Sequence, residues 1–313
     1  MGITRQQALD CFASDDLIGI GMEADAVRRT LHPEGVVSYT IDRSLDCTSP
    51  NLSALYDQVR KTVEMGATGV VLHSDVQQRV QLDHFETLFA GIKQRFPEVW
   101  LHGLSATQIL ALATSSQLSL RDTIARLHDA GLDSIASNAV ILDDEVRHRV
   151  APDKCTTADW ISVHRTAHQL GLRTTATMIF GVGESMAQRI DHLEILRSLQ
   201  QDTGGFTSFT PLAYTAGDLG IPEPTAVEYL KTLAVSRLYL DNIENLQGSW
   251  ATQGLKVLQM GLRFGGNDVG SVLLEERFGK PGGATEEELR RIIREAGFKP
   301  AQRDTIYQTM FLN

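Results

Sequence analysis

Four side chains that could transfer protons accompany short apolar runs in the first third of the sequence. Asp46 comes shortly after "GVVSYTI", His73 and Asp75 follow "TGVVL", and His102 lies within "VWLHGLS". Carboxylates and imidazoles are common general acids and bases, and different environments can hold their pKa values apart. If the fold brings these four residues to one cavity, they suit proton-transfer, lyase or cyclase chemistry.

The elements that would position these residues form a repeating pattern of short β-rich runs and helical segments. Glycine often follows a helical segment, as in "MGA" and "AGL", where a helix C-cap favours it. Eight alternations predict a single (β/α)8 barrel, an α/β TIM barrel. A doubly wound sheet is the alternative, but no glycine-rich dinucleotide loop follows the first run. The β-rich runs are residues 35–41, 68–73, 99–105, 132–137, 172–181, 205–212, 243–249 and 262–268.

We expect one domain over residues 1–313. Residues 1–34 should form two helices packed on the barrel, residues 35–270 the barrel, and residues 271–313 a C-terminal extension with a glycine-rich link and a terminal helix. Barrel active sites form at the C-terminal ends of the strands, and this rule selects further ligand-binding candidates. These are Tyr39, Asp42, Arg43, Ser105, Asn138, Thr175, Thr177, Met178, Glu184, Thr210, Tyr214, Gln247, Ser249, Trp250, Asn267 and Asp268.

Several histidines and one tryptophan have more than one interpretation. His73 fits a hydrogen-bonded loop residue as well as a general base, and His102 fits a core residue as well as a catalytic one. His164 and His168 have the i, i+4 spacing of helical metal ligands, but without an HExxH pattern we expect a solvated helix face and no metal site. Trp250, flanked by small polar residues, suits an aromatic wall for a flat ligand.

The composition argues against several classes of partner. The formal net charge is -10 and the isoelectric point about 5.4, so the surface repels phosphate backbones and we expect no nucleic acid partner. No apolar run reaches the roughly 18–20 residues of a membrane span, and the N-terminus lacks the apolar region of a signal peptide. We expect a cytoplasmic protein that binds a small molecule and no membrane, with its oligomeric state left open.

The three cysteines, Cys11, Cys47 and Cys155, are too far apart in sequence and too few to support a zinc knuckle or a disulfide framework. Only Cys47, shortly after the first β-rich run, has a position that suits a functional role.

Longer segments resemble a known enzyme family. They are "LHPEGVVSYTIDR", "LHDAGLDSI", "RTTATMIFGVGES", "SWATQGLKVLQMGLRFGGNDVGS" and "IREAGFKPAQRDT". They are similar to the cyclic dehypoxanthinyl futalosine synthases of the radical S-adenosylmethionine superfamily, and the resemblance covers nearly the whole chain. It implies a complete barrel and a role in the futalosine route to menaquinone. It also implies S-adenosylmethionine and a [4Fe-4S] cluster on a CxxxCxxC loop after the first strand.

The sequence departs from this family where the cluster and S-adenosylmethionine should lie. After "IDRSLDCTS" it continues directly into "PNLSALYDQV", and Cys47 falls where the family tends to have an aromatic residue. "LHSDVQQ" replaces a Gly-Gly segment that meets S-adenosylmethionine in the family, and "IASNAV" replaces a glycine-rich turn. We therefore expect no [4Fe-4S] cluster, and S-adenosylmethionine stays a candidate ligand.

Three functions remain open at this point. The first is an enzyme with non-radical chemistry (proton transfer, lyase, cyclase or transferase) on a nucleoside-like or aromatic small molecule. The second is a non-catalytic binder, or a partner of a futalosine-pathway synthase. The third is the family reaction itself, with iron held by other ligands. We favour the first, because the departures coincide at one side of the barrel while the segments of strands five to eight are kept.

Overall fold

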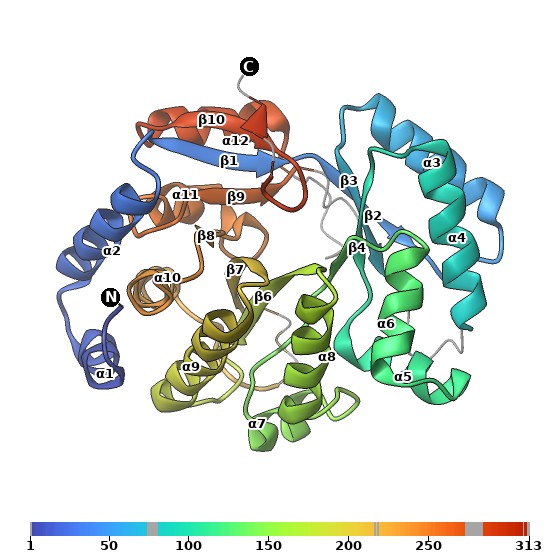
Figure 1. The fold of residues 1–313 in the computed structure, drawn as a ribbon. Coiled ribbons are helices and arrows are strands. Elements are labelled where there is room, and N and C mark those ends of the chain that lie inside the picture. Colours follow the sequence, from blue (N-terminus) through green and yellow to red (C-terminus); the bar gives the residue numbers. More distant parts are fainter. Residues whose placement is uncertain are drawn as a thin grey trace.

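Parallel strands and helices alternate along the chain and close into a barrel surrounded by helices (Figure 1). The computed structural model describes residues 2–73, 81–215, 217, 219–272, 284–308 and 310–311. The strands of this part are β1 (Val36–Thr40), β2 (Asp42–Asp46), β3 (Gly69–His73), β4 (Trp100–Gly103), β5 (Ser134–Ile135), β6 (Arg173–Phe180), β7 (Phe206–Ala213), β8 (Asn245–Leu246), β9 (Asp268–Ser271), β10 (Lys299–Arg303) and β11 (Met310–Phe311). The helices are α1 (Arg5–Ala13), α2 (Leu17–Leu31), α3 (Leu52–Glu64), α4 (Leu82–Arg95), α5 (Ala106–Ser116), α6 (Leu120–Asp129), α7 (Asp144–Val150), α8 (Thr157–Gln169), α9 (Met186–Thr203), α10 (Ala226–Tyr239), α11 (Trp250–Gly261) and α12 (Glu286–Glu295).

Two sheets share the first strand of the barrel. β2 to β8 form one parallel sheet in chain order, whereas β1 lies between β9 and β10 in the other. β1 and β2 are one strand interrupted at Ile41, so its first half pairs with β9 and its second half with β3. A parallel bridge between Gln247 and Asp268 connects the end of β8 to β9 and closes the ring. The predicted (β/α)8 fold class is confirmed.

Two strand boundaries differ from the expected ones. The first strand continues as β2 to Asp46, so Asp42 lies within it rather than beyond it. The last barrel strand is β9, which begins at Asp268, whereas residues 262–265 form a turn after α11. Leu262 and Phe264 caused this error: their alternation has the two-residue period of a strand, but both side chains are buried in the turn.

The N-terminal segment lies outside the barrel. α1 and α2 both pack against α10 (Figure 1). The side chains of Thr4 and Asp16 accept backbone N–H groups at the starts of these two helices, as N-caps do. None of the described helices is long and apolar enough to cross a membrane.

The C-terminal extension adds a hairpin to the N-terminal end of the barrel. β10 runs parallel to β1, and β11 folds back antiparallel to β10, with the connecting loop visible beside β9 in Figure 1. From this loop Thr305 contacts Gly69, the first residue of β3. The guanidinium of Arg303 donates two hydrogen bonds to the carboxylate of Asp268, at 2.6 and 3.1 Å. We call residues 303–308 the C-terminal plug.

His164 and His168 lie on the buried side of α8, so the predicted solvated face is wrong. His164 Nδ1 and His168 Nε2 both lie within hydrogen-bond distance of Thr174 Oγ1, at 3.0 and 2.7 Å, and Phe206 packs edge-on against the His168 ring. Burial and the nearby Arg173 lower the pKa of His168 to about 4. These histidines stay neutral and help to attach α8 to β6.

The buried histidines make stability depend on pH. The folded state holds the pKa of His168 at about 4, below the roughly 6.5 of an unfolded histidine, so the unfolded chain binds more protons between these values. We expect the free energy of unfolding to fall by about 3 kcal/mol from this residue as the pH drops from about 6.5 to 4. Denaturant titrations at several pH values give the free energy of unfolding as a function of pH. The slope of this pH dependence should be smaller for His168→Asn than for the native protein. His128→Asn, at an exposed position, should keep the native slope, and an equal slope for both variants would contradict the assignment.

Gly69 should be essential to the C-terminal plug. A Cβ atom here would collide with Thr305 Oγ1 and approach the carbonyl oxygen of Trp100 to 3.0 Å. We expect Gly69→Ala to destabilise the protein by roughly 1–3 kcal/mol, the usual range for overpacking. Combining it with Thr305→Ala should recover part of the loss in a double-mutant cycle measured by chemical denaturation. Strictly additive effects would show that the plug does not contact β3.

Candidate active site

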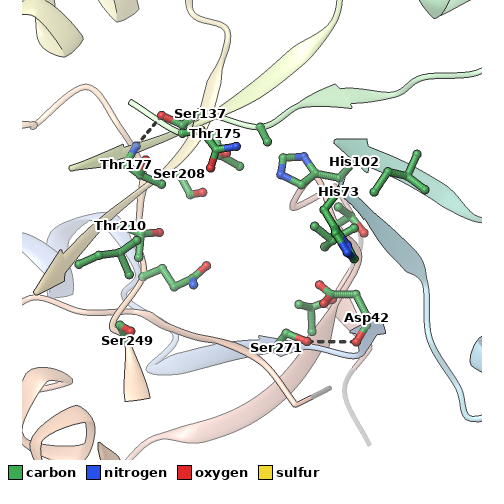
Figure 2. A pocket seen from close by; sticks show the side chains of 18 of the residues that line it. Asp42, His73, His102, Ser137, Thr175, Thr177, Ser208, Thr210, Ser249 and Ser271 are labelled. Atoms are coloured by element: carbon green, nitrogen blue, oxygen red, sulfur yellow. Dashed lines mark hydrogen bonds between the residues drawn. The ribbon is translucent and has the colours of Figure 1, made fainter. Parts of the chain in front are cut away.

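A cavity of about 240 Å³ lies inside the barrel (Figure 2). This is close to the lower end of the range for small-molecule sites, roughly 300–1,000 Å³. Most of its polar side chains are hydroxyls, from Thr40, Ser137, Thr175, Thr177, Ser208, Thr210, Ser249, Ser271, Thr305 and Tyr307. The other polar side chains are Asp42, His73, His102, Gln108, Asn138, Gln247 and Arg303. Val71, Leu72, Leu104, Ala136, Leu212 and Ala251 complete the lining.

The hydroxyls on one side of the cavity follow from the strand period. Thr175 and Thr177 of β6 pair with Ser208 and Thr210 of β7, and alternate residues of a strand face the same side. Ser137, just beyond β5, accepts the backbone N–H of Thr177 at 2.9 Å. Figure 2 shows these five side chains together, opposite the two histidines.

Two imidazoles form the other side. Ser44 Oγ lies 2.9 Å from Nδ1 of His73, and Ser134 Oγ lies 3.0 Å from Nδ1 of His102. A serine therefore orients each ring through the same nitrogen. Nε2 of His73 has no hydrogen-bond partner among the described residues. The two rings lie side by side in Figure 2, facing the cavity.

Asp46 stands next to this pair. It is the register partner of His73 across β2 and β3. Partial burial opposes its charge, but hydrogen bonds from the hydroxyl and N–H of Thr48, together with His73, lower its pKa. Asp46 is thus an ionised carboxylate beside His73.

Backbone strain gathers around the cavity. Within the described residues, five residues other than glycine have positive φ, and three of them, Leu104, Asn138 and Tyr307, line the cavity. Val140 (φ 56°) lies two residues beyond Asn138. Left-handed backbone costs such residues roughly 1–2 kcal/mol each, and strain of this kind concentrates at functional sites. Leu104 and Asn138 lie in the loops after β4 and β5, so this strain is located beside the cavity.

Nine of the predicted site residues line this cavity. They are Asp42, His73, His102, Asn138, Thr175, Thr177, Thr210, Gln247 and Ser249. Ten others lie outside its lining. They are Tyr39, Arg43, Asp46, Ser105, Met178, Glu184, Tyr214, Trp250, Asn267 and Asp268. Asp75 falls outside the described residues.

Strand alternation explains the residues that face away. Tyr39 points toward α12 and donates its hydroxyl to Glu286 at 2.5 Å. Arg43 and Met178 directly follow the lining residues Asp42 and Thr177, so they lie on the opposite face of their strands. Position near the end of a strand is therefore not enough to predict a site residue, because every second side chain of a strand faces away from the cavity.

The remaining outliers have structural partners. Ser105 caps α5, and Tyr214 packs against a small apolar cluster around Val182. Glu184 accepts the N–H groups of Gly181 and Val182 and pairs with Arg189 at 2.6 Å. The side-chain oxygen of Asn267 accepts from the guanidinium of Arg237 at 2.8 Å. The Trp250 indole donates to the carbonyl of Ser271 at 3.2 Å and packs on an apolar cluster outside the cavity.

The strand-end rule also selects Ser137, the last residue of the run 132–137, but sequence reasoning missed seven other polar lining residues. They are Thr40, Gln108, Ser208, Ser271, Arg303, Thr305 and Tyr307. The two-residue period could have found Thr40 from Asp42 and Ser208 from Thr210. Nothing local marks Arg303, Thr305 and Tyr307, because the hairpin that brings them to the barrel depends on long-range pairing.

The three cysteines lie on or beside different elements. Cys47 follows β2, is fully buried, and donates its thiol to the carbonyl of His73 at 3.0 Å. Burial and Asp46 raise the pKa of Cys47 to about 12. Cys11 lies on α1, outside the barrel, and Cys155 directly precedes Thr156, the N-cap of α8. In the part of the chain that the structure describes, no three His, Cys, Asp or Glu side chains are grouped so that they could hold a metal ion.

Comparison with known proteins defines the class. Residues 41–196 match the model of the radical SAM superfamily, and residues 205–312 match the CofH/MqnC C-terminal region. The solved structure of methylornithine synthase superposes with a TM-score of 0.74 at 14% identity, covering 96% of this chain and 95% of that one, which supports the fold.

The chain belongs to the radical SAM superfamily. It is 34% identical to the cyclic dehypoxanthine futalosine synthase of Streptomyces coelicolor, covering 99% of this chain and 86% of that protein. It is 32% identical to the same enzyme of Halalkalibacterium halodurans, covering 98% and 91%. The Streptomyces alignment spans 344 positions, more than the 313 residues here, so that relative has segments without a counterpart in this chain.

The state of Cys47 can be measured directly. Because its thiol is buried and its pKa is raised to about 12, we expect iodoacetamide to leave it unmodified in the native protein. Cys11 and Cys155 are partly exposed and should react first. Mass spectrometry of the native and guanidinium-unfolded protein would follow all three sites. Native labelling of Cys47 at the rate of Cys155 would contradict the buried placement.

Proposed function

We propose that this protein is a cluster-free enzyme that performs non-radical proton-transfer chemistry on a nucleoside-like small molecule. The observation that carries the proposal is the histidine side of the cavity, where two serine-oriented imidazoles face a hydroxyl-rich wall. General acid–base catalysis of this kind suits the lyase, cyclase and transferase reactions expected from the sequence.

The cysteines do not fit a [4Fe-4S] cluster of the kind that the superfamily implies. Such a cluster needs three thiolates on one loop. Residues 47–51 connect β2 to α3 and supply one cysteine, whose thiol is already engaged by the His73 carbonyl. The short connection is complete without a cluster: Asn51 caps α3 through the N–H of Ala54, and Thr48 closes a turn onto Asp46.

His73 is the better base or acid of the pair. Its Nδ1 is occupied by Ser44, so Nε2 is the atom that meets a ligand proton. Asp46, whose pKa is lowered, places an ionised carboxylate beside this ring. His102, oriented by Ser134, lies on the next strand and would act from the neighbouring position.

The lining indicates the class of ligand. Ten hydroxyl side chains match a molecule that carries several hydroxyl groups, and Leu72, Leu104 and Leu212 offer apolar contacts for a flat ring. Asp42 also lines the cavity. A nucleoside combines both properties. S-adenosylmethionine carries an adenosine group and belongs to the same class, and its amino-acid end would need partners other than iron.

The first test separates this proposal from radical chemistry. Anaerobic reconstitution with ferrous iron and sulfide should give a colourless protein without the electron paramagnetic resonance signal of a reduced cluster. A brown protein with a stoichiometric [4Fe-4S] signal would refute the cluster-free part of the proposal and favour the reaction of the futalosine synthases.

The second test concerns catalysis. Chelator-treated protein would be screened for turnover of nucleosides and aromatic acids without reductant. For any substrate found, His73→Asn and His102→Asn should lower kcat/KM by on the order of 10²-fold or more, whereas His128→Asn should leave it unchanged. Ligand binding without turnover, unaffected by these variants, would instead identify a non-catalytic binder.

A further inference from the structure

The N-terminal end of the cavity contains three hydroxyl groups without hydrogen-bond partners among the described residues. They are Thr40 Oγ1, Thr305 Oγ1 and Tyr307 Oη, and each oxygen is inaccessible to solvent. Tyr307 Oη lies close to the side chains of Ser208 and Asp268 but not in hydrogen-bond geometry with either. All three residues line the same cavity. Buried polar groups in folded proteins nearly always have a partner, so three unpartnered hydroxyls in one place call for an explanation.

Thr40 and Thr305 lie near the beginnings of β2 and β3, at the deep end of the barrel, although Thr40 is also the last residue of β1 and pairs with Ser271 of β9. Thr40 precedes β2, and Thr305 lies against Gly69 at the start of β3. The guanidinium of Arg303 lies 3.8 Å above the Tyr307 ring, which places the ring beside the Arg303–Asp268 pair. Two of the three hydroxyls therefore belong to the C-terminal plug, which closes this end.

The charges nearby are already balanced. Arg303 gives two hydrogen bonds to Asp268 and a third, at 2.9 Å, to the carbonyl of Asp304. Asp268 also accepts from Ser38 and from the N–H of Gly270. A phosphate or carboxylate would find no free positive charge among these groups, so a neutral group is the better match. Hydroxyls donate and accept, and other hydroxyls match them best.

We propose that the C-terminal plug forms a subsite for the hydroxyl-bearing, sugar or polyol, end of the ligand, with Thr40, Thr305 and Tyr307 as its hydrogen-bonding groups. This inference rests on the proposed function for the rest of the ligand. It orients the molecule, with the sugar deep in the barrel and the reacting part near His73 at the end of β3. Neither the family matches nor the strand-end rule assigns a role to these residues.

The test compares three probes: adenosine, adenine and D-ribose. Affinities would be measured by ligand-observed nuclear magnetic resonance for the native protein and for Thr305→Val and Tyr307→Phe. Each variant removes one hydroxyl at nearly constant shape. We expect each to weaken adenosine and D-ribose binding about fivefold, the loss of one hydrogen bond, and to leave adenine binding unchanged.

Two matched variants control for unrelated effects. Thr207→Val changes a neighbouring threonine of β7 that bonds to the carbonyl of Thr174, outside the cavity lining. Tyr56→Phe removes a hydroxyl between α3 and α4. Both should leave the affinity for adenosine unchanged.

Crystals soaked with D-ribose complete the test. Sugar hydroxyls within hydrogen-bond distance of Thr305 and Tyr307 would support the subsite. Ordered water only at these groups, equal weakening of adenosine and adenine, or no effect of either variant would overturn it. D-ribose bound at the plug without adenosine binding would support the subsite and count against the nucleoside class. Adenosine bound with its ribose near His73 would overturn the subsite and support the nucleoside class.

Discussion

One buried carboxylate connects β1, β9 and β10, the strands of the sheet that closes the barrel. Asp268 is fully buried and accepts hydrogen bonds from Ser38 of β1 at 2.5 Å, from Gly270 at 2.8 Å and from Arg303 of β10 at 2.6 and 3.1 Å. Its strand partner Gln247 connects it to β8. Removing one member of such a pair leaves an uncompensated charge, which typically costs about 3–5 kcal/mol. The closure of the ring, the position of the C-terminal plug and the depth of the cavity all depend on this group.

The sequence pattern was sufficient for the fold and for half of the cavity. Alternation of β-rich runs and helices predicted the barrel, and strand ends predicted residues such as His73 and Thr177, because parallel strands present equivalent positions to one opening. The plug could not be predicted in this way. Thr305 reaches the cavity only because Gly69 lacks a side chain, and that contact joins residues distant in sequence. The burial of His164 is also a tertiary property, set by β6 rather than by the helix pattern.

The cavity and the place where related enzymes are expected to hold a cluster are built from different parts of the barrel. The strands provide the cavity, whereas the loop between β2 and α3 is where the resemblance places iron in related enzymes. In this chain that loop is short and its polar groups are used locally, with Thr48 bonded to Asp46 and Asn51 capping α3. The two imidazoles are held by serines of the strands themselves. A change in this loop therefore alters the available reactions without disturbing the walls that surround a ligand.

The hydroxyl lining also has an evolutionary consequence. Thr175, Thr177 and Thr210 lie on strands, where a β-branched side chain packs well whether it ends in a hydroxyl or a methyl group. Exchanging threonine for valine, or serine for alanine, changes the hydrogen-bonding pattern of the cavity while its shape and strand propensity stay almost the same. Single substitutions could thus redirect ligand preference with little loss of stability, which makes this barrel a scaffold on which specificity can drift faster than fold.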